Sequence, residues 1–580
     1  MLRSLSLART DRTGSCRNAS ASWRPEDHLT RKLVGFAALK IVLLAIFLLI
    51  SNQGVADRFV DFWQRGHVLG LVVFSGVWVI ALAAVTIAAF LPALWMRLLW
   101  SVPIAVSTFA GVLSLELTKT HLTFFDVALY WAERNHLDDA TEFYFTWVVI
   151  AGAKTLVGFA AILLPPIVRL PAPRALLFAP IAPIAVIAAM ILIESGRGTK
   201  AFPEQFSGVA MMSALAISDP FGESASRLPV QLVPRGAGAT RHVFLIVDES
   251  VRGDFLDLNE RRGVTPYLRS QRQRFANFGY AVSGNNCSLF SNLILRYGGV
   301  RERLAESVHT FPSIWDYAKA AGYRTAYIDA QKSGGRLQNG MTVVERNQID
   351  AFEQPDHLPH PERDFFVAQR LREIAREPEP HFVYVNKWGA HFPFTRNYPR
   401  ASAVFVPDME ERESVGADRE RLVNSYRNTI RYNVDGFFRE LLQGDLRDVA
   451  IIYTSDHGLS LLDHENVLTH CNSADPHELE GLVPLLAMSG DPELQRNLRD
   501  AAFVNRHRAS HFQIFPTLLE LLGFDRAEVE ATYGAGLIAP LVEADRAFSF
   551  GPIAGGSGLA VRWKSMPADL RELVPTEPVS

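Results

Sequence analysis

The stretch IIYTSDHGLS, residues 451–460, joins a strand-like apolar run to two reactive side chains. The apolar run ends shortly before Gly458, which is typical of a buried strand followed by a loop. In open α/β sheets, ligands bind at the carboxyl ends of strands, and Asp456 and His457 stand at such an end. Aspartate and histidine are also common ligands of zinc. The ordinary alternative is an Asp that caps the next helix and a His that packs nearby. Other segments of the chain are needed to distinguish this alternative from a metal site.

Two further strand-like runs end in side chains of the same kind. FLIVDES brings Glu249 to a strand end, and VYVNKWGAH leads to His391. His470 follows the Asp-His pair within the loop ENVLTHCNS. Because the carboxyl ends of parallel strands meet at one edge of a sheet, we expect these side chains to converge on a metal site.

The strand-like runs alternate with helix-like segments between residues 241 and 542. The helix-like segments are FPSIWDYAKAAG, RLVNSYRNTIRYNVDGFFRELLQ and FQIFPTLLELLG. Such alternation predicts an α/β domain with a mostly parallel central sheet. With a net charge of -3, the chain has no overall basicity that would favour nucleic acid.

The amino-terminal third is far more apolar than the remainder. Five nearly unbroken apolar stretches occupy residues 33–51, 68–90, 98–115, 144–164 and 175–193. Each is close to the roughly 20 residues that a helix needs to cross a bilayer. Lys40 and Lys154 are the only charged residues inside them. The sequence therefore predicts an α-helical membrane domain with five transmembrane helices.

The basic amino-terminal tail sets the expected orientation. Residues 1–32 carry seven Arg or Lys side chains, which favours the cytoplasm. After a five-helix domain over 33–194, the odd number of spans places the remaining chain outside the cytoplasm. We expect a linker over 195–240, in which VAMMSALAISDPFG is a candidate for a helix along the membrane surface. The catalytic domain is expected over 241–580.

The segment SGNNCSLFSNLILRYGG, residues 283–299, offers a nucleophile. Small polar residues lead into an apolar helix-like run, so Cys287 or Ser288 is expected at a helix amino terminus. Free backbone N–H groups and the helix dipole favour anions there. A serine hydroxyl becomes a useful nucleophile when a metal or a base activates it. An Asn or Ser helix cap is the ordinary alternative.

These segments together resemble the sulfatase-like branch of the alkaline phosphatase superfamily. More narrowly, they resemble the membrane-bound phosphoethanolamine transferases that modify lipid A or lipopolysaccharide core. The resemblance rests on an ordered set of segments: FLIVDESVRGDFL, SGNNCSLFSNLILRYG, GYRTAYIDAQKSGG, VNKWGAHFPF, SYRNTIRYNVDGFF, TSDHGLSL and SHFQIFPTLLELLG. The chain departs from the family at Ser288, where Thr is usual, and at Leu459, where an acidic residue is common.

The resemblance implies a periplasmic, alkaline-phosphatase-like catalytic domain on the bacterial inner membrane. It implies one catalytic Zn²⁺, bound by Glu249, Asp456, His457 and the oxygen of Ser288. Ser288 would take phosphoethanolamine from a phospholipid donor, expected to be phosphatidylethanolamine, and pass it to lipid A or an envelope glycan. His391 and His470 would hold the phosphoryl group, act as acid or base, or bind a second zinc.

Alternatives on the same fold are a phosphoglycerol transferase or another phosphodiesterase, and a sulfatase that uses a modified Cys287. The sulfatase motif Cys-x-Pro-x-Arg is not met by CSLFS, which lacks both Pro and Arg. A catalytically inactive membrane sensor is the alternative from another class. The sequence leaves open whether Cys287 and Cys471, both expected near the site, form a disulfide or remain two free thiols.

Overall fold

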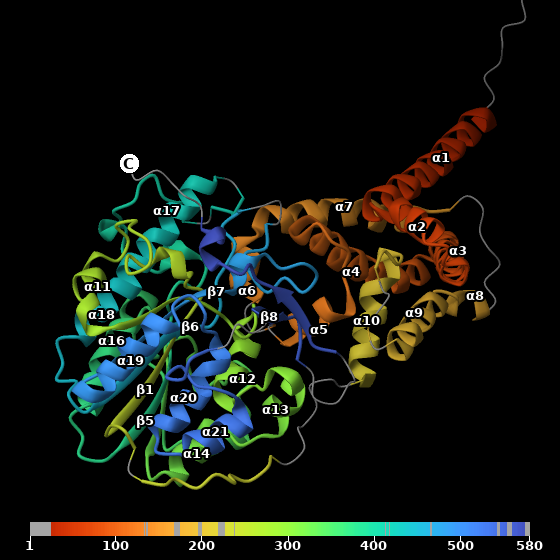
Figure 1. The fold of residues 1–580 in the computed structure, drawn as a ribbon. Coiled ribbons are helices and arrows are strands. Elements are labelled where there is room, and N and C mark those ends of the chain that lie inside the picture. The colour runs from red at the N-terminus through yellow and green to blue at the C-terminus, as the bar shows by residue number, and fades with distance from the viewer. Residues whose placement is uncertain are drawn as a thin grey trace, which may run out of the picture.

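The structure, a computed structural model, places an extended helical region beside an α/β domain (Figure 1). It describes residues 25–132, 134, 137–166, 174–194, 196, 200–218, 227–236, 238–411, 413–416, 418–463, 467–541, 546–553 and 560–574. Most of the expected cytoplasmic tail, residues 1–24, therefore lies outside the described residues.

Among the described residues, three helices are long and apolar enough to cross a membrane: α3 (Val68–Phe90), α4 (Leu94–Thr118) and α7 (Phe145–Leu163). They coincide with the second, third and fourth predicted spans. The first predicted span lies in α1 (Pro25–Ser51). This helix meets α2 (Val55–Gln64) at a 60° bend, and the two helices together are a fourth candidate for a membrane span.

The fifth predicted span is shorter than the sequence suggested. It divides into α8 (Arg174–Phe178) and α9 (Ile181–Ile193). The break falls at Pro180, and a proline disfavours helical geometry in the residue before it. With 13 residues, α9 is below the roughly 20 needed for a helix to span a bilayer alone. The described region therefore shows three to four apolar spans rather than five.

Two short helices, α5 (Phe124–Ala132) and α6 (Leu137–Phe143), lie between the third and fourth predicted spans, where the sequence predicted no helix. A third, α10 (Glu204–Ser218), contains the first ten residues of the candidate helix VAMMSALAISDPFG. The helix α10 packs against α4 and α9, with Phe206 and Met211 buried. A Cβ on Gly208 would lie 3.2 Å from the backbone of Ser107, so glycine permits this close approach of α10 to α4.

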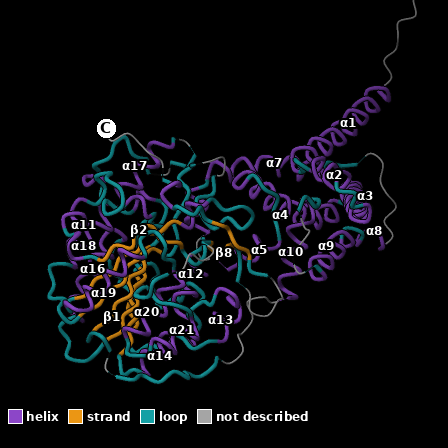
Figure 2. Tube along the Cα trace, viewed as in Figure 1, coloured by secondary structure: helices purple, strands orange, loops and turns teal. Residues whose placement is uncertain are grey.

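The α/β domain is built on a seven-stranded sheet in the order β2-β7-β6-β1-β5-β3-β4. Figure 2 shows its strands in orange, with helices around them. Its strands are β1 (His242–Asp248), β2 (Ala276–Val282), β3 (Arg324–Asp329), β4 (Ala351–Glu353), β5 (His381–Asn386), β6 (Val449–Ser455) and β7 (Leu482–Ser489). The five strands from β6 to β4 in this order are mutually parallel, whereas β7 runs antiparallel to both β6 and β2. The sheet is thus mixed and mostly parallel, in agreement with the sequence prediction.

Helices cover both faces of the sheet. The domain's helices are α11 (Pro266–Ser270), α12 (Ser288–Tyr297), α13 (Leu304–Thr310), α14 (Ile314–Ala320), α15 (Val343–Asn347), α16 (His360–Ile374), α17 (Arg419–Thr429), α18 (Gly436–Leu441), α19 (Pro492–Val504), α20 (Ile514–Leu521) and α21 (Arg526–Tyr533). A separate two-stranded sheet contains β8 (Ala547–Phe550) and β9 (Arg562–Ser565).

Alternate side chains of the central strand β1 enter two different cores. Phe244 and Ile246 pack on the side of α16 and α18. Leu245 and Val247 pack on the side of α14 and α20. A parallel strand that is buried on both faces is expected to be apolar throughout, which explains the run FLIV in this strand.

Candidate metal centre and nucleophile

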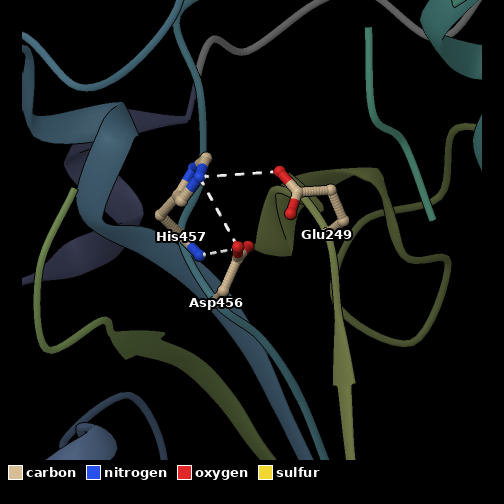
Figure 3. A group of neighbouring side chains, drawn as sticks. All are labelled: Glu249, Asp456 and His457. Atoms are coloured by element: carbon tan, nitrogen blue, oxygen red, sulfur yellow. Dashed lines mark hydrogen bonds and ion pairs between the residues drawn. The ribbon is translucent and has the colours of Figure 1, made fainter. Parts of the chain in front are cut away.

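The metal-type side chains come from the carboxyl ends of two neighbouring strands. In the parallel pair β1 and β6, Asp248 lies opposite Ser455. The next residues along each strand, Glu249 and Asp456, therefore leave the sheet side by side. Together with His457 they form a buried group whose ligand atoms lie within 4.8 Å of one another (Figure 3).

The ring of His457 is held in one orientation. Its Nδ1 donates a hydrogen bond to the carbonyl oxygen of Gly458 at 2.6 Å. Because a carbonyl only accepts, the neutral ring carries its free lone pair on Nε2. This atom lies 3.6 Å from Asp456 Oδ2 and 3.7 Å from Glu249 Oε1. Such a hydrogen bond from the second ring nitrogen is a common feature of metal-binding histidines.

The two oxygens of Asp456 have different surroundings. Its Oδ1 accepts from the backbone N–H groups of His457 at 2.7 Å and Ser250 at 3.0 Å. Its Oδ2 is buried and accepts no hydrogen bond from the described residues. A buried carboxylate oxygen without a partner is costly, and a cation bound there would remove that cost.

Among the described residues, no Lys or Arg forms an ion pair with either carboxylate. Burial and, second to it, the neighbouring Asp456 together raise the pKa of Glu249 to about 7. Burial likewise raises the pKa of Asp456 to about 6. Both shifts are those expected when negative groups share a dry site, and a divalent cation would favour their ionised forms. The donor set therefore fits a metal ion.

Ser288 begins α12 and faces this group. Its Oγ lies 3.1 Å from His457 Nε2 and 3.3 Å from Glu249 Oε2. Cys287 occupies the N-cap position and gives the helix no side-chain cap. The hydroxyl, the carboxylates and the positive end of a helix dipole thus meet at one point.

The two remaining predicted histidines line the cavity in front of Ser288. This cavity measures about 140 Å³ and also contacts Glu249. The Nδ1 of His391 donates to the carbonyl oxygen of Phe392 at 2.6 Å, and burial lowers the pKa of the His391 ring. The ring of His470 stacks on that of His457 with centroids 4.5 Å apart. All six predicted residues are therefore gathered in one region, although their chemical roles remain predictions.

Gln331 was not among the predicted site residues. Its side-chain amide donates to Glu249 Oε2 at 3.0 Å and to the carbonyl oxygen of Lys387 at 2.8 Å. It follows the end of β3 by two residues, so the strand-end rule that indicated Glu249 applies to it as well. Tyr130 and Tyr144 of the helical region also line the cavity, and no local sequence signal indicates that placement.

Cys287 and Cys471 form a disulfide, with Cα atoms 4.8 Å apart. The backbone N–H of Cys471 also donates to the carbonyl oxygen of Asn286 at 3.0 Å. The bond ties the start of α12, and with it Ser288, to the loop that carries His470. Of the two alternatives that the sequence left open, the structure shows the disulfide.

The fold and this site define a class of protein. Residues 241–524 match the Sulfatase family, and this domain belongs to the sulfatase branch of the alkaline phosphatase superfamily. The chain is also a distant homologue of phosphoethanolamine transferases. It is 24% identical over 298 residues to the Kdo(2)-lipid A phosphoethanolamine 7''-transferase of Escherichia coli (strain K12), covering 49% of this chain and 52% of that protein.

A second relative is the phosphoethanolamine transferase EptA of the same strain. It is 25% identical over 326 residues, which cover 53% of this chain and 58% of that protein. The chain spans about half the length of these relatives. In overall fold it is similar to the integral membrane lipooligosaccharide phosphoethanolamine transferase A (EptA) from Neisseria meningitidis, with a TM-score of 0.60 and 18% identity. That match covers 85% of this chain and 96% of the other.

Proposed function

We propose that this protein is a zinc-dependent phosphoethanolamine transferase with a phosphoryl-serine intermediate. The observation that carries the proposal is the placement of Ser288 Oγ, 3.1 Å from His457 Nε2, at the start of a helix and beside a buried carboxylate pair. Distant homology to enzymes named as phosphoethanolamine transferases supports the transferred group.

The zinc ion would be bound by Glu249, Asp456 and His457. The hydroxyl oxygen of Ser288 would be the fourth protein ligand. Two carboxylates and one imidazole leave a position open, as catalytic zinc sites do. Bound zinc would lower the pKa of the Ser288 hydroxyl and balance negative charge on the phosphoryl group.

In the first step, Ser288 Oγ attacks the phosphorus of phosphatidylethanolamine. A bond forms between Oγ and phosphorus, and the bond from phosphorus to the glycerol oxygen breaks. The serine proton leaves to a base, and diacylglycerol departs with a proton on its oxygen. His391 lines the cavity and is kept neutral by burial, so its ring can accept a proton.

In the second step, an oxygen of the acceptor attacks the same phosphorus, and Ser288 leaves as a hydroxyl. His470, the other histidine of the cavity, can bind the phosphoryl oxygens or exchange the proton. By similarity to the named relatives, we propose lipid A or another envelope glycan as the acceptor.

We propose an inner-membrane location with the catalytic domain in the periplasm. The apolar helices provide the membrane anchor, and a disulfide is expected on the oxidising side. In this arrangement a fifth crossing, after a cytoplasmic tail over 1–32, would need α8 and α9 together, because α9 alone is too short. The linker over 195–240 would then lead to the periplasmic domain over 241–580.

The disulfide weighs against the sulfatase alternative. A sulfatase of that type would need the sulfur-bearing carbon of Cys287 for its modified residue, and here the sulfur is bonded to Cys471. Ser288, by contrast, keeps its hydroxyl directed at the candidate metal ligands.

Replacement of the nucleophile tests the proposal. Ser288→Ala should lower transfer from phosphatidylethanolamine by roughly four orders of magnitude, because no covalent intermediate can form. Mass spectrometry of the intact wild-type protein should detect phosphoethanolamine on Ser288 before acceptor is added. Ser288→Thr should retain activity, and Ser270→Ala, an exposed control, should behave as wild type. Near-normal turnover of Ser288→Ala would contradict the proposal.

A further inference from the structure

Part of the catalytic cavity is lined by residues that the proposed chemistry does not use. Beside Ser288 and the polar residues around it, the lining contains six aromatic or apolar residues: Leu129, Tyr130, Ala140, Tyr144, Phe392 and Leu468. The first four of these belong to α5, α6 and the start of α7. The helical region therefore supplies much of an aromatic and apolar wall next to the nucleophile.

This cavity has few groups that could form an ion pair with a bound cation. Glu249 is the one carboxylate among the described residues of its lining, and it is a candidate metal ligand. None of the described lining residues is Lys or Arg. A cationic group bound here beside the metal would instead meet aromatic rings, whose negative faces attract cations within about 6 Å.

Three aromatic rings contribute to the wall, from Tyr130, Tyr144 and Phe392. The rings of Tyr144 and Phe392 have centroids 6.3 Å apart and are tilted by 60°. By the same measure, Phe392 lies 5.0 Å from His391 and 5.6 Å from His470. The aromatic wall therefore begins directly beside the two histidines that are expected to contact the phosphoryl group.

Tyr130 is the ring of this wall with no other contact to explain its hydroxyl. The hydroxyl of Tyr144 is hydrogen-bonded to Thr469, whereas that of Tyr130 has no hydrogen bond to the described residues. Burial raises the pKa of Tyr130, so the hydroxyl stays protonated. A bound cation would therefore meet the face of a neutral ring rather than a phenolate.

The reaction determines which part of the donor stays in this cavity. In an in-line displacement, Ser288 Oγ and the leaving glycerol oxygen lie on opposite sides of the phosphorus. Diacylglycerol therefore departs away from Ser288, and its two acyl chains are far too large for a cavity of about 140 Å³. The ethanolamine group stays bonded to phosphorus through both steps, so it is the part that this cavity can hold.

We propose that Tyr130, Tyr144 and Phe392 bind the ammonium group of phosphoethanolamine and thereby select the headgroup that is transferred. The inference rests on the proposed function and adds the residues that make it specific. A phosphoglycerol headgroup would place two hydroxyls against this wall, and polar groups left without hydrogen bonds weaken binding. The aromatic wall thus favours phosphoethanolamine over phosphoglycerol.

Two donors that differ in one charged group test the proposal. In phosphatidylpropanol, a methyl group replaces the ammonium of phosphatidylethanolamine. Full-length, zinc-loaded protein in detergent is mixed with each lipid, and loading of Ser288 is followed by mass spectrometry of the intact protein. The wild type should load about tenfold faster from phosphatidylethanolamine, as cation–π contacts in a desolvated site predict. A merely apolar wall would favour the propyl group, and equal or faster loading from phosphatidylpropanol would overturn the proposal.

Substitution of Tyr130 assigns this preference to its ring. Tyr130→Leu should lower the ratio of the two loading rates by roughly threefold or more, whereas Tyr130→Phe keeps the ring and should keep most of the ratio. Tyr432→Leu, in which the lost ring packs against Phe365, is the control and should keep all of it. Zinc content should be the same in all these proteins. An unchanged ratio in Tyr130→Leu would contradict the role of Tyr130, and the wild-type comparison decides the proposal even if this variant is unstable.

A binding measurement distinguishes this inference from the proposed function. If no lipid loads Ser288, the transferase proposal fails, and the soluble compounds O-phosphoethanolamine and propyl phosphate then test the aromatic wall alone. Zinc-loaded Ser288→Ala protein should bind O-phosphoethanolamine about tenfold more tightly than propyl phosphate. Ser288→Ala/Tyr130→Leu protein should lose most of this difference. Equal affinity of Ser288→Ala protein for the two compounds, or binding of neither, would reject the ammonium site.

Discussion

Asp456 uses its two oxygens for different purposes. Oδ1 accepts two backbone N–H groups and fixes the carboxylate, whereas the buried Oδ2 is left without a hydrogen bond from the described residues. This arrangement suits a metal ligand, because Oδ1 fixes the orientation of the carboxylate and Oδ2 stays available to bind the ion.

Asp456→Asn should therefore reduce zinc affinity by roughly 100-fold or more, since even outer-shell changes weaken metal sites by 10- to 100-fold. Elemental analysis of the purified full-length protein, made alongside the transfer assay, should show zinc and activity falling together. Asp475→Asn removes a carboxylate that is 77% exposed and should leave both unchanged. Full zinc content in Asp456→Asn would place the metal elsewhere.

The strand-end rule explains which site residues the sequence could reveal. Glu249, His391 and Asp456 follow apolar runs that are easy to recognise as strands. Gln331 obeys the same rule, but its amide gives no metal-ligand or acid-base signal in the sequence.

At the scale of elements, the disulfide joins the start of α12 to the His470 loop across 184 residues of chain. The sequence showed that both cysteines adjoin site residues. It could not show their separation in space, which depends on how α12 packs against a loop far away in the chain.

Loss of this link should destabilise the protein. Cys287→Ser/Cys471→Ser should lower the free energy of unfolding by about 2–5 kcal/mol, because a long loop is released in the unfolded chain. Thermal unfolding of the full-length protein measures the change, and non-reducing peptide mapping of the wild type should recover a linked peptide. Cys16→Ser keeps both partners and serves as the control. Two free thiols in the oxidised wild type would refute this prediction.

The membrane helices show where sequence patterns lose precision. Hydropathy locates α3, α4 and α7 to within a few residues, since an apolar run of about 20 residues is typical of a membrane-spanning helix. It does not reveal α5 or α6, which are short and lie between longer apolar segments. Nor does it show that Pro180 divides the last apolar stretch.

At the scale of the whole molecule, the helical region holds part of the active site in place. The carbonyl oxygen of Leu117, in α4, accepts from the backbone N–H of Val467 at 2.9 Å. Asp126, in α5, accepts from the hydroxyl of Ser473. Both contacts hold the loop that carries His470 in place. They join segments more than 300 residues apart, so local sequence could not indicate them.

Tyr144, also in the helical region, contacts Thr469, the residue next to His470. Its hydroxyl lies 3.1 Å from the Oγ1 of Thr469 and accepts from the backbone N–H of Thr469 at 3.2 Å. The same Thr469 Oγ1 lies 3.0 Å from His470 Nδ1, so the tyrosine positions the histidine through one intermediate residue. Zinc, in contrast, is expected to bind side chains supplied by β1 and β6, which Tyr144 does not hold.

Tyr144→Phe should therefore lower kcat by about tenfold, the usual effect of an unpaired buried polar group, while zinc content stays at the wild-type level. The comparison requires the full-length protein, because the tyrosine belongs to the helical region and the histidine to the catalytic domain. Tyr432→Phe, on a surface packed against Phe365, is the matched control and should change neither quantity. If Tyr144→Phe lost zinc together with activity, its role would be general stability of the domain. If Tyr144→Phe kept the full kcat, the helical region would not position His470. Membrane anchoring would then be sufficient to explain the presence of the helical region.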